Sequence, residues 1–361
     1  MKKSIVILIF ILPFITLAQY DDGFLKESFF VRQPSTRSEA LGKAYASIEG
    51  DLSSIFYNPA GTATLKGLEL YSSFASPLYT AEDAYFNFIS AGYNFNKYLT
   101  VGFSRNHLSL ETDILFTDEN GNSKTSRPQN TFYTLNLSSE PIKNWFIGLN
   151  TNYMIWEPID QSFNTLFLDF GIIKKFEIGD SENQSLNIGT SITNLNFAKI
   201  ELNYNNNTHI DTLPVISRIG ANYNVFLDRN YLFDTLHTFS FLAQAEYKFL
   251  LNSKYQTGFH SGLEVGFLEM LFLRMGYYYE NHNDYGFPDS NVDHLSEITY
   301  GFGIQIPLSK LTKIPLNIAF DYTSLPQPSY SKINTDWDNF TSYSFRVNWV
   351  INNHSNNNKT K

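Results

Sequence analysis

The feature that most constrains this chain is an alternation of apolar and polar residues, with a period of two, that recurs from residue 68 almost to the end. One run, from 297 to 306, reads EITYGFGIQI. In a β-strand successive side chains point to opposite faces, so such a run predicts a strand with one apolar and one polar face. Because these runs follow one another along the chain, the sequence predicts an all-β fold.

The length of the runs indicates where the apolar faces lie. Many runs reach ten residues or more, whereas a soluble sandwich needs roughly four to eight per strand and a tilted membrane-crossing strand needs about 9–11. A charge on a lipid-facing side costs roughly 2–4 kcal/mol at mid-membrane, and the apolar phase is nearly free of charge. We therefore expect a transmembrane antiparallel β-barrel of about 14 strands, with lipid outside and polar residues in the lumen. The expected strands are 67–76, 84–96, 98–110, 130–140, 144–157, 163–177, 185–195, 213–227, 236–250, 255–268, 270–280, 295–308, 314–324 and 341–352.

The connections between the runs alternate in length. Tight turns are expected at Asn96-Lys97 and Leu268-Glu269, on the periplasmic side. Longer polar loops are expected outside, at Asp113–Gln129, Asn203–Leu213, Asn281–Asp293 and Pro326–Asn339. Aromatic residues near strand ends are typical of the interfacial belts of membrane proteins; the candidates are Trp145, Trp156, Tyr278, Tyr279 and Trp349. The loops carry Phe116, Tyr285 and Phe287, which either contact a partner protein or gate the mouth of the barrel, or have no role.

The segment Arg37–Leu65 differs from the rest of the chain because it is helical in pattern and rich in small residues. Its apolar residues fall near helical spacing from Ala40 to Ile48, and Asp51 is a plausible cap for a second short helix over 52–57. Proline disfavours the α conformation in the residue before it, so Asn58–Gly61 predicts a sharp turn. Alone, the segment fits an ordinary helical hairpin equally well. Followed by a barrel, it is expected to fill the lumen as a hatch.

The ends of the chain predict export. Residues 1–18 combine a positive start, an apolar run and a small residue before Gln19, which indicates a signal peptide. The alternative is a membrane anchor, which is disfavoured because the apolar run is too short for a spanning helix. The expected organisation is a signal peptide at 1–18, a lead-in and hatch at 19–65, a barrel at 66–352 and a polar tail at 353–361. The expected location is the bacterial outer membrane, in contact with its lipid.

The composition argues against several other classes of function. The net charge of −9 and the lack of a basic cluster argue against nucleic acid as a partner. A chain with no cysteine has no disulfide, thiolate metal site or cysteine nucleophile. The seven histidines show no metal-ligand spacing, and Gly301-Phe302-Gly303 lies within a strand, so it is no dinucleotide motif. No enzyme activity, cofactor or metal is predicted.

Charged residues in the polar phase should point into the lumen. Their functional reading is a pathway or binding site; the more economical reading is a polar network that fills the barrel and holds the hatch through opposite charges. Arg37 and Asp51 are the expected hatch partners of these wall charges. The wall residues are Asp169, Arg218, Glu246, Lys248, His260, Glu264, Arg274, Glu280, Glu297, Asp321 and Arg346.

Together these motifs resemble a known family. Arg37-x-x-Ala40-Leu41-Gly42-x-Ala44, then Asn58-Pro59-Ala60-Gly61 and about fourteen strands, is similar to the FadL-like outer-membrane barrels, and most similar to their PorV/PorQ branch. The segment Gly189–Leu195 is also similar to a mid-barrel signature of that branch. The polar tail after Ile351 departs from the aromatic last residue common in such barrels. The resemblance implies that the hatch motif comprises Arg37, Leu41, Gly42, Ala44, Asp51, Asn58, Pro59, Ala60 and Gly61.

The resemblance implies two alternative functions. A PorV/PorQ-type protein acts in type IX protein secretion or surface attachment, as a partner of the secretion translocon and its cargo, and this is the first expectation. A FadL-type protein transports hydrophobic, fatty-acid-like small molecules, and this is the alternative. A transporter should have an apolar pocket beside the hatch and a kink or bulge in one wall strand. A secretion partner should present an exposed outer surface for protein docking.

Overall fold

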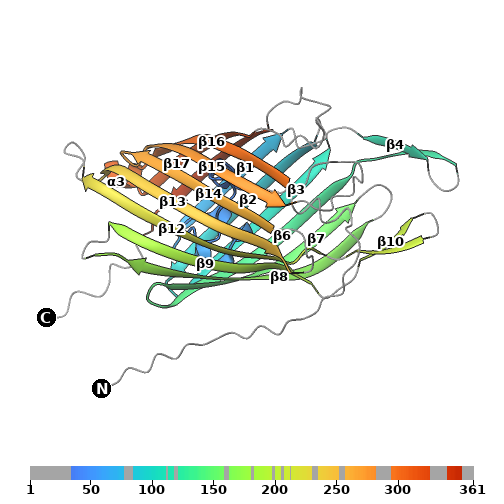
Figure 1. The fold of residues 1–361 in the computed structure, drawn as a ribbon, viewed down its shortest axis with the longest axis horizontal. Coiled ribbons are helices and arrows are strands. Elements are labelled where there is room, and N and C mark those ends of the chain that lie inside the picture. The colour runs from blue at the N-terminus through green and yellow to red at the C-terminus, as the bar shows by residue number, and fades with distance from the viewer. Residues whose placement is uncertain are drawn as a thin grey trace, which may run out of the picture.

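The barrel is closed and contains fourteen antiparallel strands (Figure 1). The computed structural model describes residues 34–76, 84–110, 113–117, 121–157, 162–179, 183–196, 200–204, 207–211, 213–229, 235–251, 257–281, 294–325 and 340–351. The strands are β1 (Leu68–Ser76), β2 (Ala84–Asn96), β3 (Leu99–Leu110), β6 (Gln129–Ile142), β7 (Trp145–Glu157), β8 (Phe163–Glu177), β9 (Gln184–Leu195), β12 (Ile216–Arg229), β13 (His237–Leu250), β14 (Thr257–Phe267), β15 (Leu271–Asn281), β16 (His294–Ile306), β17 (Leu316–Leu325) and β18 (Phe340–Trp349). Each expected strand corresponds to one of these, so the predicted fold class is confirmed.

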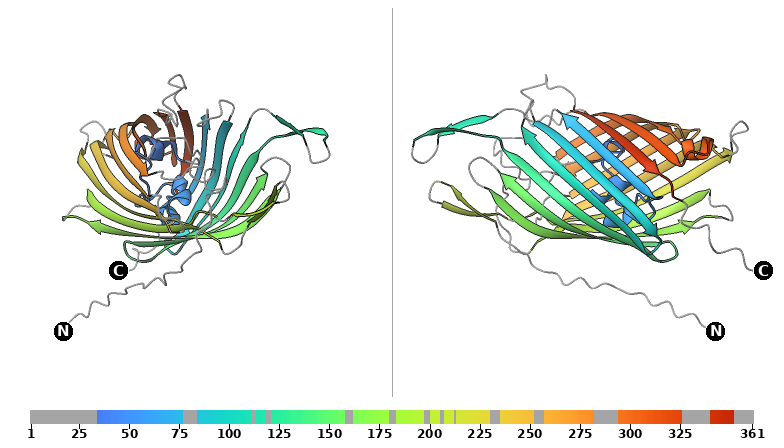
Figure 2. Two further views of the ribbon diagram at one scale, coloured as in Figure 1. Left: turned by 45° about the vertical axis from the view of Figure 1, so that its right-hand side comes forward. Right: turned by 180° about the vertical axis from the view of Figure 1, so that it is seen from behind.

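Pairing between the first and last strands closes the barrel. β1 lies antiparallel to β18, with Leu68 opposite Trp349 and Ser76 opposite Thr341 (Figure 2). Consecutive strands of the barrel are otherwise neighbours, including β3 beside β6 and β9 beside β12, where a small hairpin intervenes in the chain. Every barrel strand therefore has two hydrogen-bonded neighbours, which removes the sheet edges that a membrane does not tolerate.

Two of the expected loops contain hairpins that the sequence did not indicate. β4 (Ile114–Thr117) pairs with β5 (Ser123–Ser126), and β10 (Ile200–Tyr204) pairs with β11 (Asn207–Asp211). Both hairpins project from the same end of the barrel (Figure 1), which we call the hairpin end; the opposite end is the turn end. These strands are four or five residues long and carry no long alternation. Most of the expected loops Asn281–Asp293 and Pro326–Asn339, and all of residues 1–33 and 353–361, lie outside the described residues.

The two faces of the sheet divide as the alternation predicts. Leu263 and Leu273 on the outer face are 58% and 69% exposed, while Thr299 and Thr323 on the inner face are fully buried. An apolar outer band of this kind is favourable against lipid and unfavourable against water. This is the architecture of a bacterial outer-membrane barrel. The described helices are short, and none is long and apolar enough to cross a membrane.

The aromatic belt is only partly as expected. Trp145, Tyr279 and Trp349 face outward, and each is more than a third exposed. The prediction was wrong for Trp156 and Tyr278, which face inward and are 3% exposed. Each of the two lies on the opposite strand phase from the lipid-facing residues, and a shift of one residue reverses the face of a side chain.

At the turn end, the expected tight turn between β14 and β15 is present. Leu268 and Glu269 take positive φ angles of 54° and 52°, and Met270 N–H donates to the Phe267 carbonyl at 3.0 Å. Two successive residues at positive φ match the twist of the flanking strands. The connection between β16 and β17 instead holds the short helix α3 (Leu308–Leu311).

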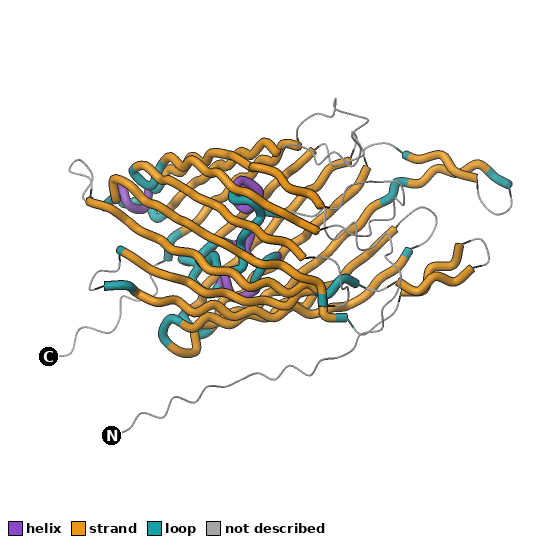
Figure 3. Tube along the Cα trace, viewed as in Figure 1, coloured by secondary structure: helices purple, strands orange, loops and turns teal. Residues whose placement is uncertain are grey.

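The hatch comprises residues 34–65 in the structure and lies inside the barrel (Figure 3). It contains α2 (Thr36–Ala40) and two 3₁₀ helices, η1 (Leu52–Phe56) and η2 (Pro59–Thr62). The Asp51 carboxylate accepts from Ser53 N–H, so the expected cap and second helix are present. The first helix is shorter than the spacing predicted, because Gly42 and Lys43 take φ angles of 66° and 67° and end it. Asn58 caps η2, which forms the expected turn.

Candidate functional site

The hatch backbone lies directly against glycines of the inner wall. A Cβ atom at Gly148 would lie 2.2 Å from the carbonyl carbon of Pro59, and one at Gly276 would lie 2.0 Å from the nitrogen of Gly42. No side chain fits at such a distance, so only glycine allows this approach. We call the wall glycines whose added Cβ would meet hatch backbone atoms the glycine seat; it comprises Gly148, Gly189, Gly262 and Gly276. The glycine-rich polar phase of the strands was the signal, but a sequence does not show which glycines meet another backbone.

Polar wall side chains satisfy the irregular backbone of the hatch. Glu246 accepts the N–H groups of both Tyr45 and Ala46 at 2.7 Å. Gln244 donates to the Ala44 carbonyl at 2.7 Å, and His260 donates through Nδ1 to the Gly42 carbonyl at 2.8 Å. Buried backbone groups outside regular structure need such partners. The stretch after α2 is therefore held by the wall rather than by helical hydrogen bonds.

The motif Asn58–Gly61 fixes the other end of the hatch. Asn58 Oδ1 accepts the Ala60 N–H at 3.0 Å, and Asn58 Nδ2 donates to the Ala46 carbonyl at 2.6 Å. A Cβ atom at Gly171 would lie 1.8 Å from Asn58 Oδ1. The asparagine thus joins the turn to the rest of the hatch, and its side chain is held against β8.

A cluster of buried charges joins the hatch to β14, β15, β17 and β18. Arg37 makes two hydrogen bonds to Glu264, at 2.8 and 2.9 Å, and Asp51 lies 3.3 Å from the Arg346 guanidinium. Arg274 bridges Glu264 at 2.5 Å and Asp321 at 2.6 Å. All of these residues except Asp51 line a cavity of about 100 Å³. Arg37 and Asp51, expected to meet wall charges, therefore lie within one alternating network.

The buried environment shifts the pKa values of two hatch carboxyl groups, Asp51 and Glu39, in opposite directions. Burial alone would raise the pKa of Asp51, but Arg346, Arg37 and hydrogen bonds from Tyr45 and Ser53 hold it at about 2. Burial raises the pKa of Glu39 to about 8, opposed by Lys43. Both carboxyl oxygens of Glu39 are buried without a hydrogen-bond partner, so the neutral form is favoured there near pH 7.

The structure places the predicted wall residues on the inner face. Those that contact the hatch are Glu246, His260, Glu264 and Arg346. Lys248 pairs with Glu280, and Arg218 lies 3.5 Å from Glu246. Glu297 is half-exposed in β16, two residues from the buried Thr299. Asp169 and Arg218 line a cavity described below. Within the described residues no three His, Asp or Glu side chains are grouped to hold a metal ion.

Removing the two hatch charges should loosen the hatch. We expect the double variant Arg37→Ala, Asp51→Ala to leak a small dye from proteoliposomes, because Glu264 and Arg346 lose their hatch partners. The matched control removes Arg127 and Asp113, another Arg–Asp pair at 2.9 Å whose side chains are about half exposed. Exposed pairs contribute only about 0–1 kcal/mol. Unchanged leak in an assembled Arg37, Asp51 variant would contradict anchoring by these charges.

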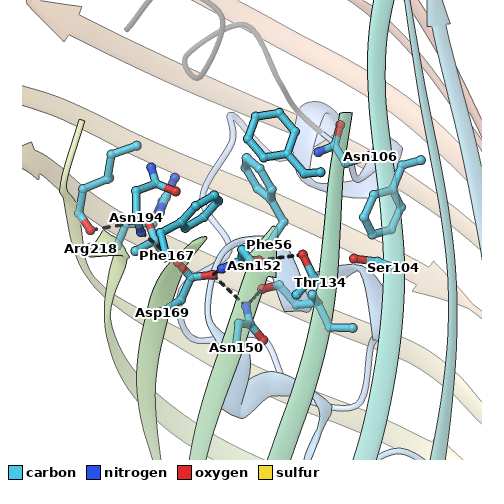
Figure 4. Close-up of a pocket in the computed structure, with 15 residues that line it drawn as sticks. Phe56, Ser104, Asn106, Thr134, Asn150, Asn152, Phe167, Asp169, Asn194 and Arg218 are labelled. Carbon is cyan, nitrogen blue, oxygen red and sulfur yellow. Dashed lines mark hydrogen bonds between the residues drawn. The ribbon is translucent and has the colours of Figure 1, made fainter. Parts of the chain in front are cut away.

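A second cavity lies between the hatch and β2, β3, β6, β7, β8, β9 and β12 (Figure 4). Its apolar lining is mostly aromatic: Ile55 and Phe56 from the hatch meet Phe88, Phe132, Phe167 and Ile216 from the wall. The cavity has a volume of about 30 Å³, enough for two or three waters at roughly 10–15 Å³ each. A larger molecule can enter only if a lining side chain rotates.

The polar lining of this cavity is organised around Asp169. Its carboxylate accepts hydrogen bonds from the side chains of Asn150 and Asn152, both at 2.8 Å, and from the Asn194 N–H at 2.7 Å. Asn150 also donates to the Ile55 carbonyl at 2.8 Å, which ties this group to the hatch. Sequence phase indicated Asp169, but not the asparagines that surround it.

The wall is irregular beside this cavity. The register of β8 with β9 shifts between Leu168 and Phe170, and Asn194 takes a φ of 64°. β8 continues to Phe163, and within the described residues, which omit 197–199, its last pairing with β9 is at Leu168. We call this place, formed by residues 163–168 and 194–196, the β8–β9 seam. Two residues that precede β12 cover the seam. Asn194 Nδ2 donates to the Pro214 carbonyl at 2.9 Å, and Leu213 packs in one cluster with Phe167. A wall-strand bulge beside a pocket is what the transport interpretation requires.

Fold and site together define a class: outer-membrane β-barrels with fourteen strands, an internal N-terminal hatch and a small cavity beside it. Neither a protein-family model nor a curated protein matches the chain. Solved structures of FadL-like barrels are similar in fold. For the toluene transporter TodX of Pseudomonas putida, identity is 10%, the match covers 86% of this chain and 96% of that one, and the TM-score is 0.47.

Two further structures give similar values. A FadL homologue of Pseudomonas aeruginosa is 12% identical over 89% of this chain and 99% of that one, with a TM-score of 0.49. The toluene transporter TbuX of Ralstonia pickettii is 8% identical over 90% and 100%, also with a TM-score of 0.49. These are distant likenesses in overall architecture and assign neither a ligand nor a partner to this chain.

Proposed function

We propose that this protein is a passive route for hydrophobic small molecules through the outer membrane. The observation that carries the proposal is the position of the aromatic cavity, which touches the hatch at Phe56 and the β8–β9 seam at Phe167 and Asn194. A molecule held there has the hatch on one side and an irregular part of the wall on the other. Apolar pockets with a few placed polar groups are the usual form of small-molecule sites.

The proposed route leaves the cavity sideways. At the β8–β9 seam the register shifts between Leu168 and Phe170, and such an irregularity interrupts the ladder of backbone hydrogen bonds that must break to part the wall. The outward neighbours Leu166 and Leu168 are 62% and 36% exposed and would meet lipid. The hatch closes the direct path, because the glycine seat holds its backbone against the wall.

The secretion interpretation stays a prediction. It requires an outer surface that docks a translocon or cargo protein, at the hairpin end of the barrel. Two of the four loops expected there, Asn281–Asp293 and Pro326–Asn339, lie almost wholly outside the described residues. By contrast, the cavity and the seam are features that transport uses and docking does not. Transport is therefore the better supported function.

Phe56 provides the test of the proposal. It is the one lining phenylalanine that comes from the hatch, and it is half-buried, whereas Phe88, Phe132 and Phe167 are at most 4% exposed. We expect Phe56→Ala to speed the uptake of toluene into proteoliposomes several-fold, because truncation enlarges the cavity. Phe56→Trp should slow uptake.

The control for these variants is Phe95→Ala, which removes a phenyl ring that is 50% exposed on the barrel's outer surface. Its uptake should equal that of the unchanged protein. The proposal fails if vesicles with the unchanged protein take up toluene no faster than empty vesicles, or if both Phe56 variants behave like the control. Co-purification of a translocon or cargo protein from membranes, without bound lipid, would favour secretion instead.

A further inference from the structure

We infer that the cavity binds neutral hydrophobic molecules carrying one hydroxyl or amide group, and that Asn106 holds this polar group. The inference rests on the proposed transport function and specifies its ligand. It ranks two neighbouring classes below these ligands: hydrocarbons without a polar group bind more weakly, and hydrophobic anions such as carboxylates do not bind.

Asn106 is the residue that points to a ligand. It lies on β3, is 3% exposed and lines the cavity (Figure 4), yet neither its Oδ1 nor its Nδ2 has a hydrogen-bond partner. In the sheet it lies between Phe88 on β2 and Phe132 on β6, its register partners. Buried amides are nearly always hydrogen-bonded, so an unpaired one between two phenyl rings is poised for a group that comes from outside.

The other polar side chains around Asp169 are already paired. Thr134 donates to Asn152 at 2.6 Å, while Asn150 and Asn152 both donate to Asp169. Among the residues that line the cavity, Asn106 is thus the one whose side-chain donor and acceptor are both buried and unpaired. A hydroxyl or amide supplies an acceptor and a donor at once, and so satisfies both. A hydrocarbon satisfies neither.

The charges of the cavity argue against an anionic ligand. Arg218 lines the cavity, but its guanidinium faces Glu246 at 3.5 Å and donates to Thr193 at 3.2 Å. The Asp169 carboxylate is a second lining charge, and it is negative. A ligand carboxylate would therefore be buried beside like charge with no unpaired cation to balance it, which is strongly unfavourable.

The test compares three probes with the same methylated ring: toluene, para-cresol and para-toluate. Trp156 is a built-in reporter, because it packs in one cluster with Phe132 and Phe167, which line the cavity. The other three tryptophans are Trp145 and Trp349, which face outward, and Trp337, which lies outside the described residues. Replacing these three by Phe leaves Trp156 as the only indole fluorophore. Titration calorimetry on the unchanged chain provides a second readout.

We expect para-cresol to bind about tenfold more tightly than toluene, or better, because two buried polar groups become paired. Para-toluate should show no saturable binding at pH 7. Asn106→Leu should abolish the preference for para-cresol while toluene binding persists, and Asn106→Gln, which keeps the amide, should retain part of it.

The outcomes separate this inference from the proposed function. Equal binding of toluene and para-cresol, tight binding of para-toluate, or a preference that survives Asn106→Leu would overturn the inference and leave transport standing. If none of the three probes binds to a barrel that still shows heat-dependent gel mobility, the transport proposal itself fails.

Discussion

Proteoliposomes containing Gly189→Ala are expected to conduct ions, while those containing Gly220→Ala stay closed. The two glycines are register partners on β9 and β12. A Cβ atom at Gly189 would lie 2.1 Å from the carbonyl oxygen of Ala46, so the hatch must move away from the wall. At Gly220 the nearest atom would be 3.2 Å away and belongs to Ala245 of the wall, and the Ala46 Cβ would be at 3.5 Å.

The expected size of this effect follows from the cost of overpacking. Inserting a methyl group into a packed site costs about 1–3 kcal/mol, which raises the population of a displaced hatch by roughly 5–150-fold. Gly276→Ala, at a distant point of the glycine seat, should add to it. Planar-bilayer recording measures the conductance, and gel mobility before and after heating shows that the barrel has assembled. Equal conductance of the Gly189 and Gly220 variants would contradict the glycine seat.

Locking the hatch with disulfides is expected to leave the uptake of toluene unchanged, whereas locking the β8–β9 seam stops it. The chain has no native cysteine, so an engineered pair is unique. Thr36 and Ser342 have hydroxyl oxygens 2.7 Å apart, as do Thr62 and Ser138, so cysteines at either pair can join the hatch to the wall. The hatch would then be fixed at both ends.

The pair that locks the seam is Thr165 and Asn196, whose side chains are hydrogen-bonded at 2.8 Å across it. Under oxidising conditions the variant Thr165→Cys, Asn196→Cys should take up toluene no faster than empty vesicles. A reductant should restore uptake, so each protein serves as its own control. If instead the hatch locks stop uptake and the seam lock does not, the route passes through the hatch and the sideways exit is wrong.

The sequence was sufficient to predict the barrel because lipid imposes a rule that every wall strand obeys. Apolar side chains at every second position are needed over some ten residues, and this requirement is local, so all fourteen strands could be located. The β4–β5 and β10–β11 hairpins are not part of the barrel wall, so the rule does not apply to them and the sequence did not predict them. Trp156 and Tyr278 were misplaced because strand ends carry aromatics on both phases.

The sequence predicted only those site residues that can be recognised from their own type or strand phase, without knowing their neighbours in the fold. Charge alone indicated Arg37 and Asp51 as hatch contacts, and strand phase indicated Asp169. The cavity is different, because it brings Phe56 beside Phe167 and Asn106, which lie far apart in the sequence. Their meeting depends on how the hatch sits on the glycine seat and on the shift in β8, neither of which has a local sequence signal.

The closure of the barrel by β1 and β18 has a consequence for how the protein is made. β1 is the first strand of the barrel and follows the hatch directly, and β18 is its last strand, so the ring cannot close until every strand between them is available. The hatch contacts wall strands around the circumference, from β6 at Thr62 to β18 at Thr36. Once the barrel is closed, its wall has no opening through which this segment could insert from the side. The geometry therefore favours an order of assembly in which the N-terminal segment comes first and the sheet curls around it.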